Sequence, residues 1–229
     1  MDLYNPLLRR LIISVLGLPI FLLVSCSYTD SSMATISQPS IEKDSSSLSA
    51  YNLFNKAITL RSEGNLDKAK RNLLEVIVLD DKRIDAYTLL GDIYFGENDF
   101  EQAEVMYLAS IELNAENPVL FGNLGVIFDI NGEQEKAISS YLESIRLSPN
   151  DAQIHYNLGL AYSRNIEFLD DAIMRFLRAL ELDPSLGNVH YDLGRIYEYL
   201  DQTILAIEHY RNSVELGYAL AEQSLRQLE

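Results

Sequence analysis

The sequence predicts an all-α fold, in which five helix pairs stack into a solenoid that a short C-terminal helix closes. The first observation is a Leu-Gly pair that recurs at intervals of 34, 34 and 35 residues. The second is an aromatic residue three positions after each of these glycines, and the third is an alanine of closely matching period. The positions are Leu90-Gly91, Leu124-Gly125, Leu158-Gly159 and Leu193-Gly194; Tyr94, Phe128, Tyr162 and Tyr197; and Ala69, Ala103, Ala137, Ala172 and Ala206. A period of this length indicates stacked supersecondary units.

A degenerate repeat precedes the four clear ones. Ala69 carries the alanine period back by one unit, where Ala57 occupies the glycine position and Leu60 the aromatic position. The predicted repeats are residues 50–83, 84–117, 118–151, 152–186 and 187–220.

Each repeat contains two apolar runs at helical spacing, separated by a polar turn. We expect the glycine and the alanine to lie where the two helices cross, because small residues allow the backbones to approach closely. Bulky rings are expected to fill the space beside them, and Pro149 and Pro184 stop second helices because proline cannot continue the hydrogen-bond ladder. The rings are Tyr107, Tyr141, Phe176 and Tyr210.

The end of the array is predicted to carry a capping helix at residues 219–229. Ala221, Leu225 and Leu228 form one apolar stripe of this segment, and its polar residues lie opposite. Such a helix would cover the exposed face of the last repeat.

The pattern of an aromatic residue, Leu-Gly, Tyr, Ala and a closing Pro resembles the tetratricopeptide repeat, over about residues 50–220. The resemblance implies a right-handed α-solenoid whose first helices line a concave face that receives peptides or partner helices. Carried onto this sequence by register, the candidate groove residues are Asn55, Asn123, Tyr156, Asn157, Arg164, Tyr191 and Arg195.

One subclass of the family grips a C-terminal carboxylate with Lys, Asn and Arg. This chain has the asparagines but lacks the lysines, since Asp85, Val119, Gln153 and Asn188 stand where they would be needed. We therefore expect no such clamp, and a groove of Tyr, Asn and Arg suits hydrogen bonds and aromatic contacts with a polar peptide.

The fourth repeat has one extra residue, in "SRNIEFLDD", which lacks the glycine that turns the other loops. This turn is either a variant without functional effect or a longer loop that presents Phe168 to a partner.

The first 25 residues have the parts of an export signal: Arg9 and Arg10, an apolar run to Val24, and a small-residue end. "LVSC", which ends at Cys26, resembles the bacterial lipobox. That resemblance implies a lipidated Cys26 as the mature first residue, in a bacterial envelope protein, and Ser27 favours the outer membrane, facing the periplasm. The alternative is an uncleaved membrane anchor that begins near Leu7.

Residues 26–49 are predicted to be a disordered tether that follows the lipid. Nine of the 23 residues from Ser27 to Ser49 are serine, and the few apolar residues are not periodic. Such a segment does not bury enough surface to fold.

The composition and the motifs exclude several functions. The chain has 34 acidic and 18 basic residues, a net charge of −16, which argues against a nucleic-acid partner. Enzyme signatures such as a phosphate-binding loop or a nucleophile elbow are absent, so we expect no catalytic residues, no cofactor and no small-molecule substrate.

The histidines are expected to pack rather than to bind metal. His155 and His190 occupy equivalent positions one repeat apart, roughly 10 Å by helix-packing distance, which is too far for shared metal ligation. His209 lies on a second helix with no obvious ligand partner.

These observations predict a lipid-anchored adaptor that binds protein or peptide partners in its groove. It resembles the lipoprotein pilotins of type IV pilus assembly and the periplasmic repeat lipoproteins that gather cell-wall enzymes. The alternatives are an uncleaved scaffold anchored in the inner membrane and an accessory subunit of an envelope enzyme.

Overall fold

The computed structural model describes residues 39–229 of the chain. The predicted export signal, the lipidation site Cys26 and residues 26–38 of the predicted tether lie outside the described residues. No helix within the described range combines the length and the apolar character needed to cross a membrane.

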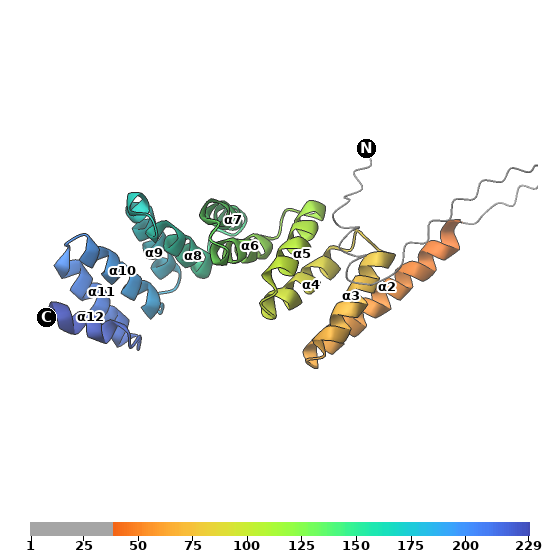
Figure 1. The fold of residues 1–229 in the computed structure, drawn as a ribbon, viewed down its shortest axis with the longest axis horizontal. Coiled ribbons are helices and arrows are strands. Elements are labelled where there is room, and N and C mark those ends of the chain that lie inside the picture. Colours follow the sequence, from red (N-terminus) through yellow and green to blue (C-terminus); the bar gives the residue numbers. More distant parts are fainter. Residues whose placement is uncertain (1–38) are drawn as a thin grey trace, which may run out of the picture. The chain divides into compact units, whose positions relative to one another are not determined.

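The described residues confirm the all-α prediction, with five helix pairs and a final short helix (Figure 1). No strand is assigned between residues 39 and 229. The elements are α2 (Pro39–Ser62), α3 (Leu66–Leu79), α4 (Ile84–Gly96), α5 (Phe100–Leu113), α6 (Pro118–Ile130), α7 (Gln134–Leu147), α8 (Ala152–Ser163), the 3₁₀ turn η1 (Ile166–Phe168), α9 (Leu169–Leu182), α10 (Gly187–Tyr199), α11 (Thr203–Glu215) and α12 (Ala221–Leu228).

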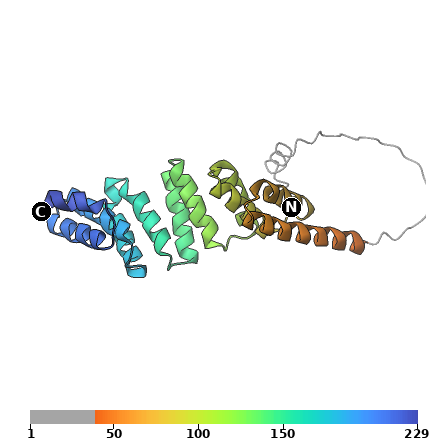
Figure 2. The same cartoon turned by 90° about the horizontal axis from the view of Figure 1, so that it is seen from below.

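The chain divides into two compact units within α4, one ending at Ile93 and one comprising Tyr94–Glu229. In the first, α2 packs along α3 and buries Ala57, Leu73 and Val76. In the second, the pairs α6–α7, α8–α9 and α10–α11 follow one another (Figure 2), and each pair contacts the next.

The first helix begins at Pro39, so the predicted disorder of residues 39–49 is wrong. Proline suits the first turn of a helix, because its fixed φ is helical and its missing N–H is not needed there. Once the repeat helix exists, each further residue adds one hydrogen bond without a new nucleation step. The helix therefore extends through serines whose composition alone favours disorder.

The crossing of the two helices in a repeat is held by a glycine against a ring. A Cβ atom added at Gly125 would lie 2.4 Å from the Tyr141 ring, and one at Gly159 would lie 2.5 Å from the Phe176 ring. Gly194 has the same relation to Tyr210, at 2.6 Å. Any side chain larger than hydrogen would therefore push the two helices apart.

The degenerate first repeat solves the same packing problem with different residues. Ala57 occupies the glycine register and Leu73 the ring register, and both are fully buried. A methyl group on the first helix is accommodated because the residue from the second helix is narrower than a phenyl ring.

In the third and fifth repeats a buried serine, which the repeat pattern did not reveal, ties the end of the second helix to the start of the first. Ser144 Oγ donates to the carbonyl of Pro118 at 2.8 Å, and Ser213 Oγ donates to the carbonyl of Gly187 at 2.7 Å. These bonds keep the serine hydroxyls paired inside the core, where an unpaired polar group would be costly. Ala179 stands in this register in the fourth repeat.

Four of the five turns within helix pairs contain one residue with positive φ: Gly64, Asn98, Gly132 and Asp201. The sequence predicted glycine at these turns, but Asn98 and Asp201 have positive φ in two of them. Their short polar side chains tolerate this conformation. The next amide then bonds back into the first helix, as in Glu133 N–H to Phe128 O at 2.8 Å.

The helix α12 covers the second helix of the last repeat. Ala221 is fully buried with Ala206 and Tyr210, and Leu225 and Leu228 pack against this cluster. The apolar stripe expected for residues 219–229 therefore faces the repeat.

We expect Gly159→Ala to lower the free energy of unfolding by about 1–3 kcal/mol, because the new methyl group overlaps the Phe176 ring. Gly96→Ala is the matched control, since a Cβ there meets nothing within 4 Å. Urea unfolding checks both, and equal stability of the two variants would contradict this packing. The double variant Gly159→Ala/Phe176→Leu, which copies the first repeat, should lose less than the two single variants together.

Candidate functional site

An open cavity of about 900 Å³ lies in the C-terminal unit, where the fourth and fifth repeats meet. Polar side chains from the end of α8, the turn that follows and α10 line it together with apolar side chains of the same turn, α9 and α10. The lining residues are Gln134, Ser163, Arg164, Asn165, Ile166, Leu169, Phe176, Asp192, Arg195, Ile196, Glu198 and Tyr199. This volume lies within the range of ligand pockets.

The longer turn of the fourth repeat forms one wall of the cavity. No residue between Arg164 and Leu169 has positive φ; instead Asn165 is extended, and its side chain accepts the amide of Glu167 at 3.0 Å. The chain then makes the 3₁₀ turn η1, which leaves Ile166 62% exposed. Phe168 packs on Tyr162, with ring centroids 5.9 Å apart, and remains partly exposed.

Arg164 joins the third and fourth repeats. Its guanidinium donates through both terminal nitrogens to the Asp129 carboxylate of α6, with Nη2 to Oδ2 at 2.9 Å. A two-pronged ion pair of this kind fixes the plane of the guanidinium. The cation at the rim of the cavity is therefore oriented before any ligand arrives.

Asp192 joins the fourth and fifth repeats. The Tyr156 hydroxyl donates to its Oδ2 at 3.1 Å, and the Arg195 guanidinium lies 3.7 Å from its Oδ1. Burial raises the pKa of the Asp192 carboxyl, and the Tyr156 hydrogen bond and Arg195 partly offset this. Burial and the nearby carboxylate also raise the pKa of Tyr156 to about 12, so its hydroxyl remains a donor at neutral pH.

The other predicted groove residues do not line the cavity. Asn123 donates to the Tyr107 hydroxyl at 3.0 Å, and Asn157 accepts from Gln153 at 2.9 Å. Tyr191 packs between the Tyr210 and Tyr218 rings, and Asn55 is exposed on α2 in the N-terminal unit.

The structure thus gathers three predicted positions around the cavity: Arg164 and Arg195 in its lining, and Tyr156 behind Asp192. Sequence reasoning missed Ile166, Glu198 and Tyr199. Tyr199 stands one helical turn after Arg195, so the i, i+4 spacing was the available signal.

The histidines divide into one buried residue and one pair. His155 is buried as predicted, and its Nε2 lies 3.1 Å from the carbonyl of Pro149. His190 and His209 form the pair, with Nδ1 of one ring 2.9 Å from Nδ1 of the other, a contact that the repeat register did not reveal. Tyr197 stacks on the other side of His209, at 5.3 Å. Residues 39–229 hold no group of three or more side chains suited to a metal ion.

Family models match three segments of the chain. Residues 130–165 match a TPR-repeat model, and residues 84–117 and 187–216 match a tetratricopeptide-repeat model. The chain contains tetratricopeptide repeats. No curated protein matches the sequence at a significant level.

Solved structures with this repeat fold are similar to the chain. YrrB, described as a TPR protein with an unusual peptide-binding site, is 23% identical and has a TM-score of 0.71, over 81% of this chain and 95% of its own. A MamA fragment from Desulfovibrio magneticus RS-1 is 22% identical with a TM-score of 0.69, over 75% of this chain and 96% of the fragment. PilF from Pseudomonas aeruginosa is 20% identical with a TM-score of 0.61, over 82% of this chain and 88% of PilF. At these identities the likeness concerns the fold.

We expect the last tetratricopeptide repeat to lose stability as the pH falls below about 6.5, the ordinary histidine value. Burial lowers the pKa values of His190 and His209, and each keeps a lowered value although Glu208 opposes the shift. The folded state therefore takes up protons less readily than the unfolded chain, so stability is fully present above that pH and falls as the pH falls through it.

Urea unfolding at about pH 7.5 and about pH 5.5 brackets this range. The double variant His190→Gln/His209→Gln should lose less stability between the two than the natural chain does. An equal loss in both proteins would contradict a role for the histidine pair.

Proposed function

We propose that this chain is a membrane-tethered adaptor of the bacterial envelope that binds a polypeptide partner at the fourth and fifth tetratricopeptide repeats. The observation that carries the proposal is the cavity of about 900 Å³, whose lining combines apolar side chains with arginine, aspartate and amide groups. Bonds between neighbouring repeats hold these groups in place, and preorganised sites lose less entropy on binding.

The partner-binding residues in this proposal are those of the concave groove. Arg195 is more accessible to a partner than Arg164 is. Its side chain is 63% exposed, and its only ion pair within the described residues is the 3.7 Å contact with Asp192. Asn157 and Arg164 offer further polar groups in the C-terminal unit. Asn55 is exposed on α2 and offers its amide within the N-terminal unit. Asn123 and Tyr191 contribute by positioning their neighbours, since their side chains are engaged with Tyr107 and Tyr210.

A binding role suits the chemistry of the site better than catalysis. Asp192 is held by Tyr156 and Arg195, Arg164 is held by Asp129, and Glu198 accepts the Tyr210 hydroxyl at 2.7 Å. Charged groups engaged in this way orient a ligand by hydrogen bonds and apolar contact. An accessory role beside an envelope enzyme is compatible with the same groove.

The tether in this proposal is the lipid on Cys26. Support comes from the sequence, where "LVSC" follows a basic start and an apolar run. Two or three acyl chains give a stable anchor, and the partner's effective concentration at the membrane rises. We propose an outer-membrane location facing the periplasm, with pilus or secretin assembly or the recruitment of cell-wall enzymes as the process. The alternative is an uncleaved scaffold of the inner membrane.

A photo-crosslinking amino acid in place of Tyr199, at the rim of the cavity, is expected to capture a partner in living bacteria. The same amino acid in place of Met174, which is exposed elsewhere on α9, is the matched control. Equal capture from both positions, or none from Tyr199, would contradict the proposed groove.

Cys26→Ala is expected to abolish metabolic labelling with radioactive palmitate and to release the chain from the membrane fraction, because the thiol is the only site for the diacylglyceryl group. Ser25→Ala, which keeps a small residue before the cysteine, should label normally. A Cys26→Ala protein that keeps its label or its membrane retention would rule out the lipoprotein.

A further inference from the structure

Apolar side chains reach solvent along one edge of the C-terminal unit, where the first helix of each pair turns into the second. Tyr199 is 60% exposed and Ile204 is 83% exposed, on either side of the turn between α10 and α11. Ile130 at the end of α6 and Ile166 in the turn after α8 are also exposed. We call this row, with the cavity beside it, the turn edge.

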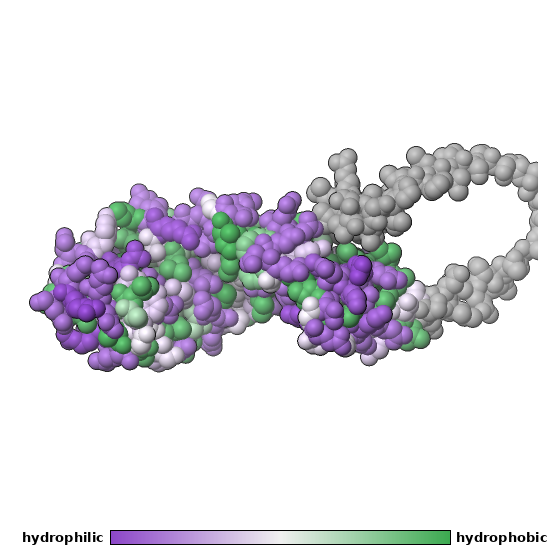
Figure 3. All heavy atoms as spheres, turned by 60° about the horizontal axis from the view of Figure 1, so that its bottom comes forward, coloured by the Kyte–Doolittle hydropathy of each residue, from purple (hydrophilic) through white to green (hydrophobic). Residues whose placement is uncertain are grey.

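The turn edge is continuous across three repeats. Arg164 reaches Asp129 of the preceding repeat, and Gln134 donates to the carbonyl of Ala161 at 2.8 Å. The cavity is lined by Gln134, Ile166 and Tyr199, so residues from three successive turns share one hollow. Hydrophobic residues reach the surface of this unit amid hydrophilic ones (Figure 3).

Negative charge surrounds this apolar row. Residues 129–136, 164–171 and 192–204 each have a net charge of −2, whereas residues 137–147, 172–182 and 205–215 of the second helices sum to zero. The three cations of the edge are paired within it: Lys136 with Glu133, Arg164 with Asp129 and Arg195 with Asp192.

Six acids of the edge take part in no ion pair in the described part of the chain: Glu135, Glu167, Asp170, Asp171, Glu198 and Asp201. Acids at helix starts offset the helix dipole, which accounts for the positions of Glu135, Asp170 and Asp171. Asp201 closes its turn with positive φ, but neither the helix dipole nor the turns account for the exposed apolar side chains between the acids.

We propose that the turn edge of the third, fourth and fifth repeats binds a basic segment of a partner protein, in which Lys or Arg alternates with large apolar residues. This inference rests on the proposed function and specifies the chemistry of the partner. The apolar side chains of the partner segment would cover Ile166, Tyr199 and Ile204 and enter the cavity. Its lysines and arginines would pair with the six acids. Exposed apolar surface rimmed by charge is typical of docking sites.

The charge of the turn edge also favours one kind of partner over others. A second copy of this chain would bring a net charge of −16 to an edge that already carries −6. Anionic lipid headgroups would be repelled in the same way. A basic apolar segment is attracted at a distance and loses apolar surface on contact.

The test uses the purified full chain and three fluorescent peptides measured by anisotropy: one of alternating Lys-Lys and Leu-Phe pairs, one with Glu in place of Lys, and one with Ser in place of Leu and Phe. Only the basic apolar peptide should bind well, and its affinity should fall as salt rises. Stronger binding of the Glu peptide would overturn the inference while leaving a polypeptide-binding groove intact.

Matched variants locate the binding. Glu135→Gln/Glu167→Gln/Asp201→Asn should weaken binding about tenfold, since exposed pairs each contribute modestly. Glu112→Gln/Glu116→Gln/Glu215→Gln makes the same change of charge away from the edge and should have little effect. An equal loss of peptide affinity in both variants would mean that only the net charge of the chain matters, and it would overturn the inference.

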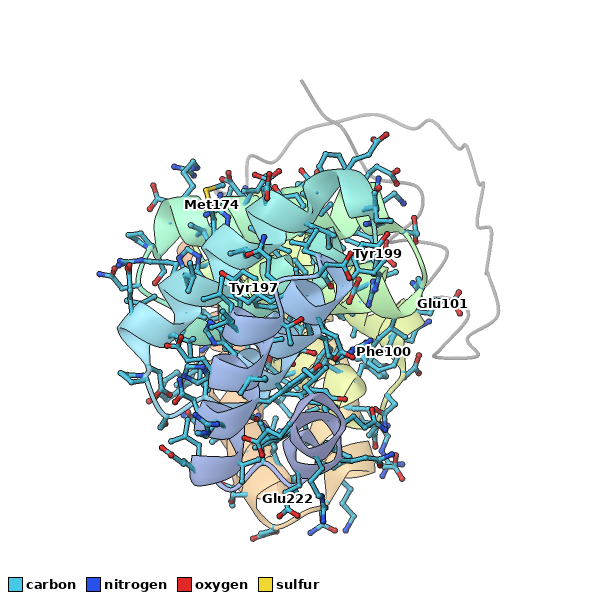
Figure 4. The ribbon with its side chains drawn as sticks, turned by 90° about the vertical axis from the view of Figure 1, so that its left-hand side faces the viewer. Phe100, Glu101, Met174, Tyr197, Tyr199 and Glu222 are labelled. Carbon is cyan, nitrogen blue, oxygen red and sulfur yellow. The ribbon has the colours of Figure 1, made fainter. Side chains whose placement is uncertain are left out.

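The apolar row is tested in the same assay. Ile166→Ser/Ile204→Ser should also weaken binding, whereas Met174→Ser should not. Viewed along the repeats, Met174 lies toward a different side of the unit from Tyr199 (Figure 4). Urea unfolding of each variant shows that it is folded. If none of the three peptides binds, the inference is wrong, and the crosslink from Tyr199 still tests the proposed function separately.

Discussion

The close contact between a glycine on one helix and a ring on the next is the constraint on which the rest of this molecule depends. Gly125, Gly159 and Gly194 each lie so near a Tyr or Phe ring that a Cβ atom would overlap it. The contact sets how closely the helices of a pair approach and therefore where the first helices stand. The bonds between first helices, Arg164 to Asp129 and Tyr156 to Asp192, form only when successive pairs keep this spacing.

The one departure from the regular period explains why the cavity lies where it does. In the other repeats a residue with positive φ closes the turn, but the fourth repeat makes a 3₁₀ turn at Ile166–Phe168. This places Ser163, Arg164, Asn165 and Ile166 along one wall, opposite the end of α10. The longer turn thus borders the candidate site, and its outermost apolar residue is Ile166 rather than Phe168.

Much of the fold could be predicted because it repeats. Periodic Leu-Gly pairs and alanines predict helix pairs and their packing partners. A small residue on one helix leaves the space that a ring on the other helix fills. The start of the first helix could not be predicted, since "SIEKDSSSLSA" has the composition of a linker and is helical only as the extension of a packed helix.

The candidate site was less accessible to sequence reasoning. Arg164 and Arg195 could be assigned to the groove by register, but their pairing with Asp129 and Asp192 depends on side-chain directions between repeats. The contact between His190 and His209 joins two helices of one repeat, and periodicity says nothing about such a pair. The Ser144 and Ser213 bonds were missed because this register also holds valine and alanine, at Val76 and Ala179, so serine is not a regular part of the repeat.

The most direct test of this account is a crystal structure of the chain with the basic apolar peptide bound. The account predicts that an apolar side chain of the peptide lies between Ile166 and Tyr199, and that its lysines lie within about 4 Å of Glu167 or Asp201. A peptide bound instead at the opposite ends of the helices, beside Glu112, Glu116 or Glu215, would contradict it.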